Sequence, residues 1–588
     1  MSERHESRRI GRRDFLKLST AAIAAAAVGR ASGAEAPPKR PNIVFVFSDE
    51  HRWCSLPFTQ MPELVAPAMA RMAREGARFD HCYSTSAICV PYRGMLITGQ
   101  WPHQSSVISN NYFGDTDVIG VNSPTIAHTF KQAGYVTGYV GKWHLKNETC
   151  HNAGFDEFIH WQYGDNHMRT KVRDVTAGEG FHIHEGYNAT GMTDQALEFI
   201  GRHAGGDRPF LMMLSINPPH YRWDDAPDDC LALYPEDEIP FRPNVTDPRH
   251  RQGEKLRNYR HYHAHITAVD RELGRLMEAA TRLGIDEDTV IIYTSDHGSS
   301  FGSNGFFNKA NPYDEASRVP MLVRWPGKVP AGRVVESLMG SIDVYPTLCG
   351  LSRIKPPATC GGEDYSPAML GGRGPEPAST LLLVNNFRRN YIRARLQPGK
   401  RHMNNAFRGV RTKRYTYVVD DLGEWQLFDN VADPYQQTNL VDDPAHAATR
   451  AELRRELDRW LAKAEDPYIP DPWRRMSLPE RIAHQNEYYA VMRHKGRWDR
   501  CKADALAPYL AAATTDRQRA DLRAAVDRLC DQRYFGLVLA IDNELNGRRR
   551  WTRRPLGELR AMLADHEQAF TERVSAEAQR ILASTSRP

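Results

Sequence analysis

The sequence is poor in cysteine, in net charge and in long apolar runs. Its nine cysteines are dispersed without the spacing of a zinc motif, which argues against a cysteine-ligated metal module. The 77 basic and 72 acidic residues leave a net charge of only +5, which argues against a nucleic-acid binder. No apolar run reaches the ~20 residues of a transmembrane helix, so no transmembrane segment is predicted. The length of 588 residues predicts more than one core.

The N-terminus has the pattern of a twin-arginine export signal. Residues 12–17 read Arg-Arg-Asp-Phe-Leu-Lys, an apolar stretch covers 18–28, and small residues follow at 31–34. The apolar stretch has about 11 residues, which is too short to span a bilayer. We therefore predict a signal peptide over residues 1–36, export of the folded chain by the twin-arginine translocation machinery, and a periplasmic or secreted location.

A short motif, Cys-x-Pro-x-Arg, occupies residues 89–93. Cys89 lies where a loop should turn into a helix, and the positive end of a helix dipole lowers the pKa of a thiol. The guanidinium of Arg93 adds to that field and suits a tetrahedral oxyanion held beside the sulfur. Taken alone the motif would more often mark a buried structural cysteine, because five loose positions recur by chance.

Four apolar segments each end in polar residues of the kinds that bind metals or anions. The segments cover residues 42–47, 135–140, 210–216 and 289–293, and the polar groups that follow them are 48–51, 141–144, 217–220 and 294–298. Continuous apolar stretches with β-branched and aromatic residues are typical of buried strands. Ligand sites in open α/β sheets lie outside the carboxyl ends of such strands, so we expect the four groups to converge on one site.

Together these motifs resemble a type I sulfatase of the alkaline phosphatase superfamily. The matching segments are 41–50, 89–99, 141–144, 217–220, 294–298, Lys309, 313–320, 409–415 and 427–434. They follow the family's order across roughly residues 40 to 465, and they are specific jointly rather than singly. The resemblance implies an enzyme that hydrolyses sulfate monoesters of a glycan or of a sulfated small molecule.

The resemblance also implies that a formylglycine-generating maturation enzyme oxidises Cys89 to Cα-formylglycine. This aldehyde hydrates to a gem-diol, which keeps a second hydroxyl after it has been sulfated. Deprotonation of that hydroxyl expels sulfate and restores the aldehyde, so covalent catalysis divides one difficult step into two easier ones. The family usually has Ser where this chain has Tyr92, but the maturation machinery recognises mainly the Cys, Pro and Arg of the motif.

The family further implies one divalent metal beside the modified cysteine. The expected ligands are Asp49, Glu50, Cys89, Asp296 and His297. Hard carboxylates suit Ca²⁺, which is the metal that we expect, with Mg²⁺ or Mn²⁺ as alternatives. The imidazole of His297 is a ligand more typical of transition metals.

Basic residues of the same segments receive the remaining catalytic roles. Arg93, Lys142 and Lys309 would neutralise the non-bridging sulfate oxygens in the transition state. His144 is the expected base for the second hydroxyl of the hydrate, and His220 is the expected donor to the leaving oxygen. The two lysines and two histidines would each alone be ordinary surface or turn residues, and only their joint occurrence in family order favours catalysis.

Two other functions fit the same residues. A phosphonate or phosphate ester hydrolase would use the same pocket, because the Cys-x-Pro-x-Arg loop does not separate these chemistries. If Tyr92 prevented modification of Cys89, the chain would be a non-catalytic binder of sulfated glycans. The basic cluster at 548–554 would suit such a binder, although such clusters are more often solvated loops.

The predicted fold is α/β, with a doubly wound, mixed but mostly parallel sheet and helices on both faces. Amphipathic segments at 193–203 and 266–283 are expected helices. The predicted domains are a signal peptide over 1–36, a catalytic α/β domain over 40–375, a smaller α+β subdomain with an antiparallel sheet over 376–465, and a helical C-terminal extension over 466–588.

Overall fold

The computed structural model describes residues 39–105, 107–110, 112–113, 124–145, 153–161, 166–236, 238–385, 406–420, 423–466, 504–531, 568 and 571–583. The predicted signal peptide and the basic cluster at 548–554 lie outside these residues. All elements named below belong to one compact unit that begins at Pro41. None of the helices in the described ranges has both the length and the apolar character that crossing a membrane requires.

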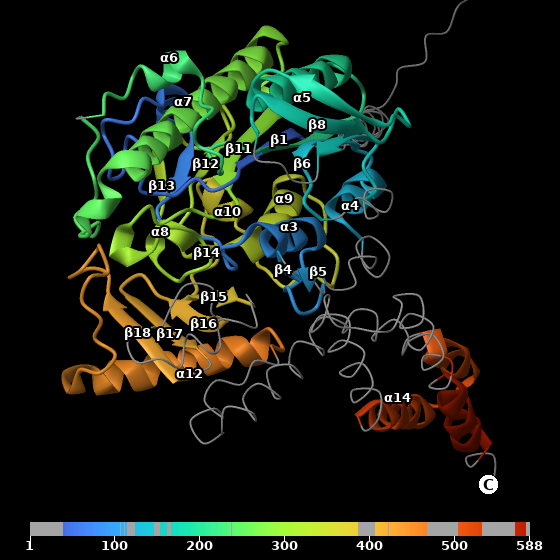
Figure 1. The fold of residues 1–588 in the computed structure, drawn as a ribbon. Coiled ribbons are helices and arrows are strands. Elements are labelled where there is room, and N and C mark those ends of the chain that lie inside the picture. The colour runs from blue at the N-terminus through green and yellow to red at the C-terminus, as the bar shows by residue number, and fades with distance from the viewer. Residues whose placement is uncertain are drawn as a thin grey trace, which may run out of the picture. The chain divides into compact units, whose positions relative to one another are not determined.

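A ten-stranded sheet forms the centre of this unit (Figure 1). Its strands are β1 (Asn42–Ser48), β2 (Ala77–Phe79), β6 (Val136–Lys142), β7 (Glu157–Trp161), β8 (Arg169–Asp174), β9 (Phe181–Glu185), β10 (Phe210–Ile216), β11 (Thr289–Ser295), β12 (Met321–Arg324) and β13 (Arg333–Val335). Their order across the sheet is β13-β2-β12-β11-β1-β10-β6-β7-β8-β9. The run from β11 to β7 is parallel, whereas β12 and the edge pair β8 and β9 are antiparallel to their neighbours. This confirms the mixed, mostly parallel sheet predicted from the sequence.

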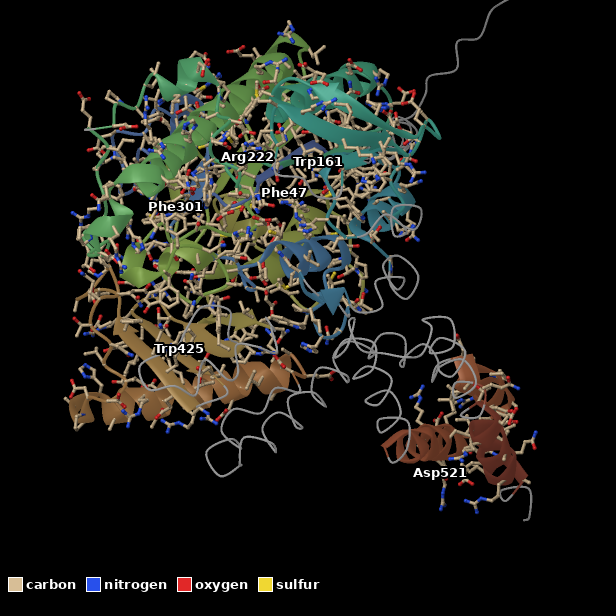
Figure 2. The ribbon with its side chains drawn as sticks, viewed as in Figure 1. Phe47, Trp161, Arg222, Phe301, Trp425 and Asp521 are labelled. Carbon is tan, nitrogen blue, oxygen red and sulfur yellow. The ribbon has the colours of Figure 1, made fainter. Side chains whose placement is uncertain are left out.

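Helices cover both faces of the sheet (Figure 1). They are α2 (Pro67–Glu75), α3 (Cys89–Thr98), α4 (Ile126–Gln132), α5 (Asn188–His203), α7 (Gly253–Arg282) and α9 (Val344–Leu351). Val44 and Val46 of β1 pack in one core with α2, α5 and α7. Phe45 and Phe47, which alternate with them, pack in a second core with α3, α4 and α9 (Figure 2 labels Phe47). Burial on both faces explains why β1 is apolar without alternation.

A four-stranded antiparallel sheet forms the smaller subdomain. Its strands are β15 (Thr380–Val384), β16 (Phe407–Arg411), β17 (Tyr415–Asp420) and β18 (Gly423–Asp429). Helix α12 (Ala447–Lys463) packs on this sheet through Leu453, Leu457 and Leu461. The same apolar cluster contains Met95 and Trp101, so the subdomain is in direct contact with α3 and the turn after it.

Helix α7 begins well before its predicted start. It extends from Gly253 rather than from Ile266, and its first half buries the rings of Tyr259, Tyr262 and His263. These rings have polar tips and apolar bodies, so a pattern based on aliphatic residues does not register them. Helix α5 likewise begins before its predicted start.

Within the predicted C-terminal extension, the described residues are helical at 504–512, in α14 (Asp516–Asp531) and at 571–583. Cys349 and Cys360, which are close enough in sequence to pair, are both free thiols in the structure. The predicted domain boundaries stay predictions.

Candidate active site

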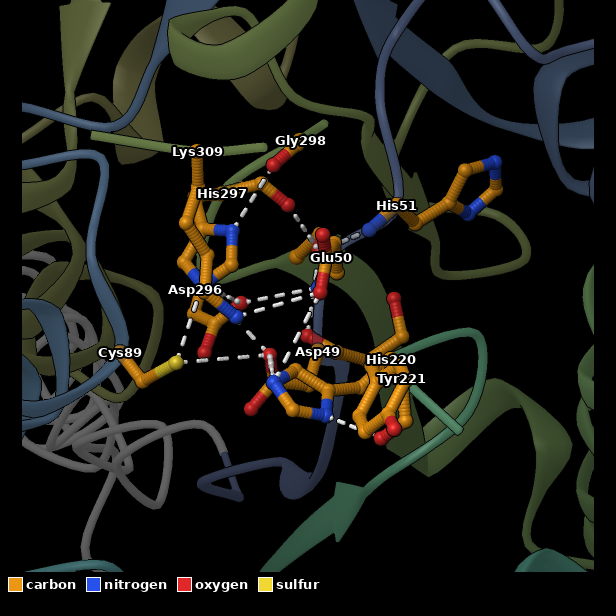
Figure 3. A network of polar contacts seen from close by, with 12 residues as sticks. Asp49, Glu50, His51, Cys89, His220, Tyr221, Asp296, His297, Gly298 and Lys309 are labelled. Atoms are coloured by element: carbon orange, nitrogen blue, oxygen red, sulfur yellow. Dashed lines mark hydrogen bonds and ion pairs between the residues drawn. The ribbon is translucent and has the colours of Figure 1, made fainter. Parts of the chain in front are cut away.

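Two aspartates lie side by side at the carboxyl ends of neighbouring strands (Figure 3). The parallel register of β1 and β11 pairs Ser48 with Ser295, so the next residues are Asp49 and Asp296. The amide of Asp296 donates to the carbonyl of Ser48 at 3.1 Å, and the amide of Glu50 donates to Asp296 Oδ1 at 3.1 Å. Strand register therefore places the two carboxylates next to each other. Both aspartates are fully buried, so this part of the site is largely closed to water.

Cys89 is the first residue of α3, and its sulfur faces these aspartates (Figure 3). Its Sγ lies 3.1 Å from His297 Nε2 and 3.6 Å from Asp49 Oδ1. The other ring nitrogen of His297 lies 2.9 Å from the carbonyl oxygen of Gly298, which fixes the ring with Nε2 toward the sulfur. Asp49, Cys89, Asp296 and His297 each offer a ligand atom, and these atoms lie within 4.8 Å of one another.

Two buried cations hold the aspartates in place. Lys142, the last residue of β6, places its Nζ 2.6 Å from Asp49 Oδ2. Arg93 Nη2 donates to Asp49 Oδ2 at 3.0 Å and to Asp296 Oδ2 at 3.3 Å. Arg93 Nη1 donates to the hydroxyl of Ser215 at 2.8 Å and to the carbonyl of Lys142 at 2.6 Å. The guanidinium therefore links α3 to the ends of four strands, β1, β6, β10 and β11, and orients both carboxylates.

Glu50, Lys309 and His220 form a second group beside the aspartates (Figure 3). Lys309 Nζ donates to Glu50 Oε2 at 3.1 Å, and His220 Nε2 lies 3.6 Å from the same oxygen. The side chains of Lys309 and His220 are 14% and 13% exposed, whereas that of Glu50 is 1% exposed. Lys309 and His220 can therefore reach a molecule that enters from solvent.

His144 follows β6 and contacts the side chain of Cys89. Its φ of 58° is uncommon for a residue other than glycine, and such conformations gather at functional sites. Burial lowers the pKa of His144 to about 4, although the contact with Cys89 acts in the opposite direction. The ring is therefore neutral near pH 7 and carries a lone pair beside position 89.

Burial and charge shift the acids of the site in different directions. Burial raises the pKa of Asp49, but Lys142 and the other cations outweigh this effect and hold the pKa well below its usual range. Burial and the charge of Asp49 raise the pKa of Asp296 to about 7. For the Cys89 thiol, burial and the charge of Asp49 act to raise the pKa, but the positive charges of Lys309, His297 and Lys142 outweigh them. The pKa of the thiol is therefore well below its usual value. The cations therefore stabilise negative charge at position 89.

The donor set fits a divalent cation. Asp49 and Asp296 bring two carboxylates into contact range of one imidazole and one sulfur, and a cation between them would remove their repulsion. Glu50 Oε1 is buried and has no hydrogen-bond partner among the described residues. Position 89 also fits a formylglycine, because its sulfur stands where a hydroxyl oxygen of the hydrated aldehyde would lie and faces polar groups.

The structure brings together all the residues that the sequence predicted for the site, although they come from separate segments of the chain. Glu50 lies with Lys309 and His220 rather than in the four-residue cluster around the sulfur. Tyr92 turns away into the apolar core, with its ring centroid 6.3 Å from that of Phe47. The sequence did not predict the role of Ser215, whose hydroxyl accepts a hydrogen bond from Arg93, although Ser215 lies near the end of a predicted strand. The catalytic roles stay predictions.

Comparisons with known proteins identify the family. The model described as Sulfatase matches residues 41–354, and that described as N-sulphoglucosamine sulphohydrolase, C-terminal, matches residues 302–463. The chain is 31% identical over 442 residues to an ulvan-active sulfatase of Formosa agariphila, covering 73% of this chain and 83% of that protein. It is 26% identical to an N-acetylglucosamine-6-O-sulfatase of Bacteroides thetaiotaomicron, covering 73% and 87% of the two chains.

A solved structure supports the same assignment. The putative sulfatase YidJ of Bacteroides fragilis superposes with a TM-score of 0.63 at 27% identity, covering 74% of this chain and 98% of that one. Sulfatases of this type generally use a divalent metal and a formylglycine made from cysteine, for both of which the present structure offers a candidate position. The chain belongs to the sulfatase family of the alkaline phosphatase superfamily, the enzymes that hydrolyse sulfuric esters.

Proposed function

We propose that the chain hydrolyses sulfate monoesters of a carbohydrate at the site around Cys89. The observation that carries this proposal is the position of the Cys89 sulfur, 3.1 Å from His297 Nε2 and 3.6 Å from Asp49 Oδ1. A structural cysteine at the start of a helix would pack among apolar side chains. This one faces ligand groups and cations instead, as a catalytic group must.

Ca²⁺ is the proposed metal, and Mg²⁺ or Mn²⁺ would fit the same oxygen-rich set. Asp49, Asp296, His297 and the group at position 89 would hold it, with Glu50 beside them. When bound, such an ion supplies positive charge to the sulfate oxygens and to the nucleophile. Arg93 contacts both aspartates and Lys142 contacts Asp49, so these cations orient the carboxylates toward the metal and favour their ionised forms.

His144 and His220 would move the protons of the reaction. The hydrate of a formylglycine at position 89 supplies the nucleophile in this proposal. His144, neutral and in contact with residue 89, is placed to take a proton from a hydroxyl there. His220, which is partly exposed, would give a proton from Nε2 to the leaving alcohol oxygen. General acid–base help of this kind is worth ~10²–10⁴-fold in rate.

The cations beside the nucleophile would receive the sulfate group. Lys142 and Lys309 contact Asp49 and Glu50 in the structure, and each has further donor protons for a sulfate oxygen. Their ammonium groups, with the guanidinium of Arg93, would stabilise the charge that builds on these oxygens in the transition state. Lys309 is the most exposed of the three and would be the first to meet the substrate.

The substrate class follows from the relatives and from the surface beside His220. One relative is named for activity on ulvan and another for N-acetylglucosamine 6-O-sulfate. Tyr221, next to His220 (Figure 3), is 49% exposed, and an exposed aromatic ring beside an acid suits contact with the apolar face of a sugar. We infer a sulfated glycan or a smaller sulfated sugar.

Maturation and export complete the proposal. A formylglycine-generating enzyme would convert Cys89, and the structure favours this despite Tyr92, because that side chain is buried away from the sulfur. The twin-arginine signal predicted over residues 1–36 would then carry the folded, modified chain to the periplasm or out of the cell.

The test compares sulfate and phosphonate esters of one aryl alcohol, with protein produced alongside a maturation enzyme. We expect the sulfate ester to have the higher kcat/KM and Cys89→Ala to abolish turnover while leaving the circular dichroism spectrum unchanged. A preference for the phosphonate would assign the site to phosphonate ester hydrolysis. Mass spectrometry of the peptide that contains Cys89 decides the remaining alternative. An unmodified thiol throughout, with binding of sulfated glycans but no turnover, would show a non-catalytic binder.

A further inference from the structure

A second cluster of metal-binding side chains lies outside the proposed active site. His167 precedes β8, Asp225 lies on the segment after β10, and His265 lies in α7. His167 Nδ1 is 2.7 Å from Asp225 Oδ1, and His265 Nε2 is 3.5 Å from the same oxygen. Each of the three residues offers a ligand atom, and these atoms lie within 4.8 Å of one another.

The cluster is buried, and one ring nitrogen of each histidine, Nε2, has no hydrogen-bond partner among the described residues. The side chains of His167 and His265 are 0% exposed and that of Asp225 is 16% exposed. His265 Nδ1 lies 2.8 Å from the hydroxyl of Tyr187, which turns Nε2 toward Asp225. That Nε2 has no hydrogen-bond partner among the residues that the structure describes. A buried ring nitrogen that faces a carboxylate oxygen at 3.5 Å without a hydrogen bond calls for an explanation, and an ion held between the two atoms supplies one.

We propose that His167, Asp225 and His265 form a second metal site, for a transition metal such as Zn²⁺. Two imidazoles and one carboxylate are the donors that suit Zn²⁺, whereas Ca²⁺ takes oxygen ligands almost exclusively. Burial lowers the pKa of both imidazoles, which are therefore neutral and able to bind. The site is distinct from the one around Cys89, and it does not depend on the proposed function.

The spacing of the ligand atoms supports this assignment. Tetrahedral Zn²⁺ with bonds of ~2.0–2.1 Å places its ligand atoms about 3.3 Å apart. The 3.5 Å between His265 Nε2 and Asp225 Oδ1 already matches that spacing. The 2.7 Å contact of His167 with Asp225 is a hydrogen bond that would open by about 0.6 Å as the metal enters. A fourth position would be left for solvent.

The metal would join three parts of the fold, namely the residue before β8, the segment after β10 and helix α7. Asp225 follows His220 and Tyr221 on the same segment, and His265 anchors the other side on α7. A second contact already holds this corner, because Asp225 Oδ2 accepts from the amide of His167 at 2.8 Å. The site would therefore fix the segment that carries His220, as structural zinc does when it replaces apolar packing.

The experiment measures zinc in the full chain carrying Cys89→Ala, which removes the thiol of the other cluster. Protein is equilibrated with Zn²⁺ in excess Ca²⁺, so that the carboxylate-rich site is filled by calcium, and is then freed of unbound metal by gel filtration. We expect Asp225→Asn and His265→Gln each to retain about one equivalent less zinc than the parent. Replacement by Co²⁺ should give the parent, but neither variant, the visible absorption of a cobalt–imidazole site.

His263→Gln is the matched control, because His263 is equally buried on the same helix and lies outside the cluster. It should retain the zinc of the parent. Asp225→Asn lies at a partly exposed position and keeps the comparison informative if His265→Gln does not fold. Equal zinc in the parent and in Asp225→Asn would overturn the proposal, as would an equal loss in His263→Gln. The histidines and Asp225 would then be an ordinary hydrogen-bonded network.

Discussion

Replacing Lys309 tests whether the proposed sulfate-binding lysine also supports the fold. In the structure its Nζ contacts Glu50 Oε2 at 3.1 Å, and Glu50 is 1% exposed. Lys309→Met leaves that carboxylate buried, with His220 at 3.6 Å as its nearest remaining basic group among the described residues. Removing one partner of a buried ion pair costs ~3–5 kcal/mol, and we take ~3 because Lys309 is partly exposed. At ~2 °C per kcal/mol this predicts a fall in Tm of about 6 °C.

The same substitution should lower kcat on an aryl sulfate by ~10²–10³-fold, the cost of one lost transition-state contact. The double variant Lys309→Met/Glu50→Gln separates the two effects. Glutamine removes the stranded charge, so Tm should return most of the way while kcat stays low. Both quantities are measured on the same preparations, by calorimetry and by aryl alcohol release.

Lys463→Met is the matched control for stability. Its Nζ lies 3.0 Å from Glu363 Oε1, but the two side chains are 51% and 57% exposed. An exposed pair of this kind is worth ~0–1 kcal/mol, so Tm should change by less than about 2 °C. Recovery of both Tm and kcat in the Glu50→Gln double variant would refute the assignment of Lys309 to sulfate, because the lysine would then serve only to neutralise Glu50.

Chelation of the bound metal should abolish turnover and lower Tm, and added Ca²⁺ should restore both, as followed by activity and calorimetry; Tm unchanged by chelation would contradict a metal held in the buried cluster. Burial raises the pKa of Asp270 to about 6, while its carboxylate accepts from the amides of Ala68 and Met69. Because the folded state binds this proton more tightly than the unfolded state, stability should fall as pH rises from about 4 to about 6, and Asp270→Asn should remove that fall in pH-dependent unfolding. The side chains of Arg408 and Asp466 form an ion pair and are both 0% exposed, so Arg408→Met leaves a buried carboxylate without its arginine. We expect the free energy of unfolding, measured by chemical denaturation, to fall by ~3–5 kcal/mol, and a fall below ~1 kcal/mol would contradict burial of this pair.

The sequence was most informative about the strands that form the site. The apolar runs at 42–47 and 289–293 end before Asp49 and Asp296, and the structure confirms that both runs are parallel strands of one sheet. The ends of these strands can be predicted because a change from apolar to polar residues marks the point at which the chain leaves the core. The sequence also predicted that a helix begins at Cys89, since Pro91 is tolerated in a first helical turn.

Contacts between segments that are distant in the sequence could not be predicted from composition or periodicity. Lys309 lies on a loop with no strand or helix pattern, and its pairing with Glu50 depends on how that loop crosses the end of β1. The cluster of His167, Asp225 and His265 was missed for the same reason, because each residue belongs to a different element and none is part of a compact motif. Tertiary convergence of this kind leaves no local signal in the sequence.

Charge balance explains how the buried charged groups of the site can be stable before a metal or substrate binds and can still favour the binding of both. Three acids, including Asp49 and Asp296, face three permanent cations, including Arg93 and Lys142, so the formal charges of these six groups cancel once Asp296, whose pKa is about 7, has lost its proton. A divalent ion would leave an excess of two positive charges in a buried region, where charge is poorly screened. A sulfate monoester carries one negative charge and offsets only half of that excess. The remaining positive charge can stabilise the alkoxide that develops as the sulfur–oxygen bond breaks, so the same groups that hold the metal also favour the transition state over the bound ester.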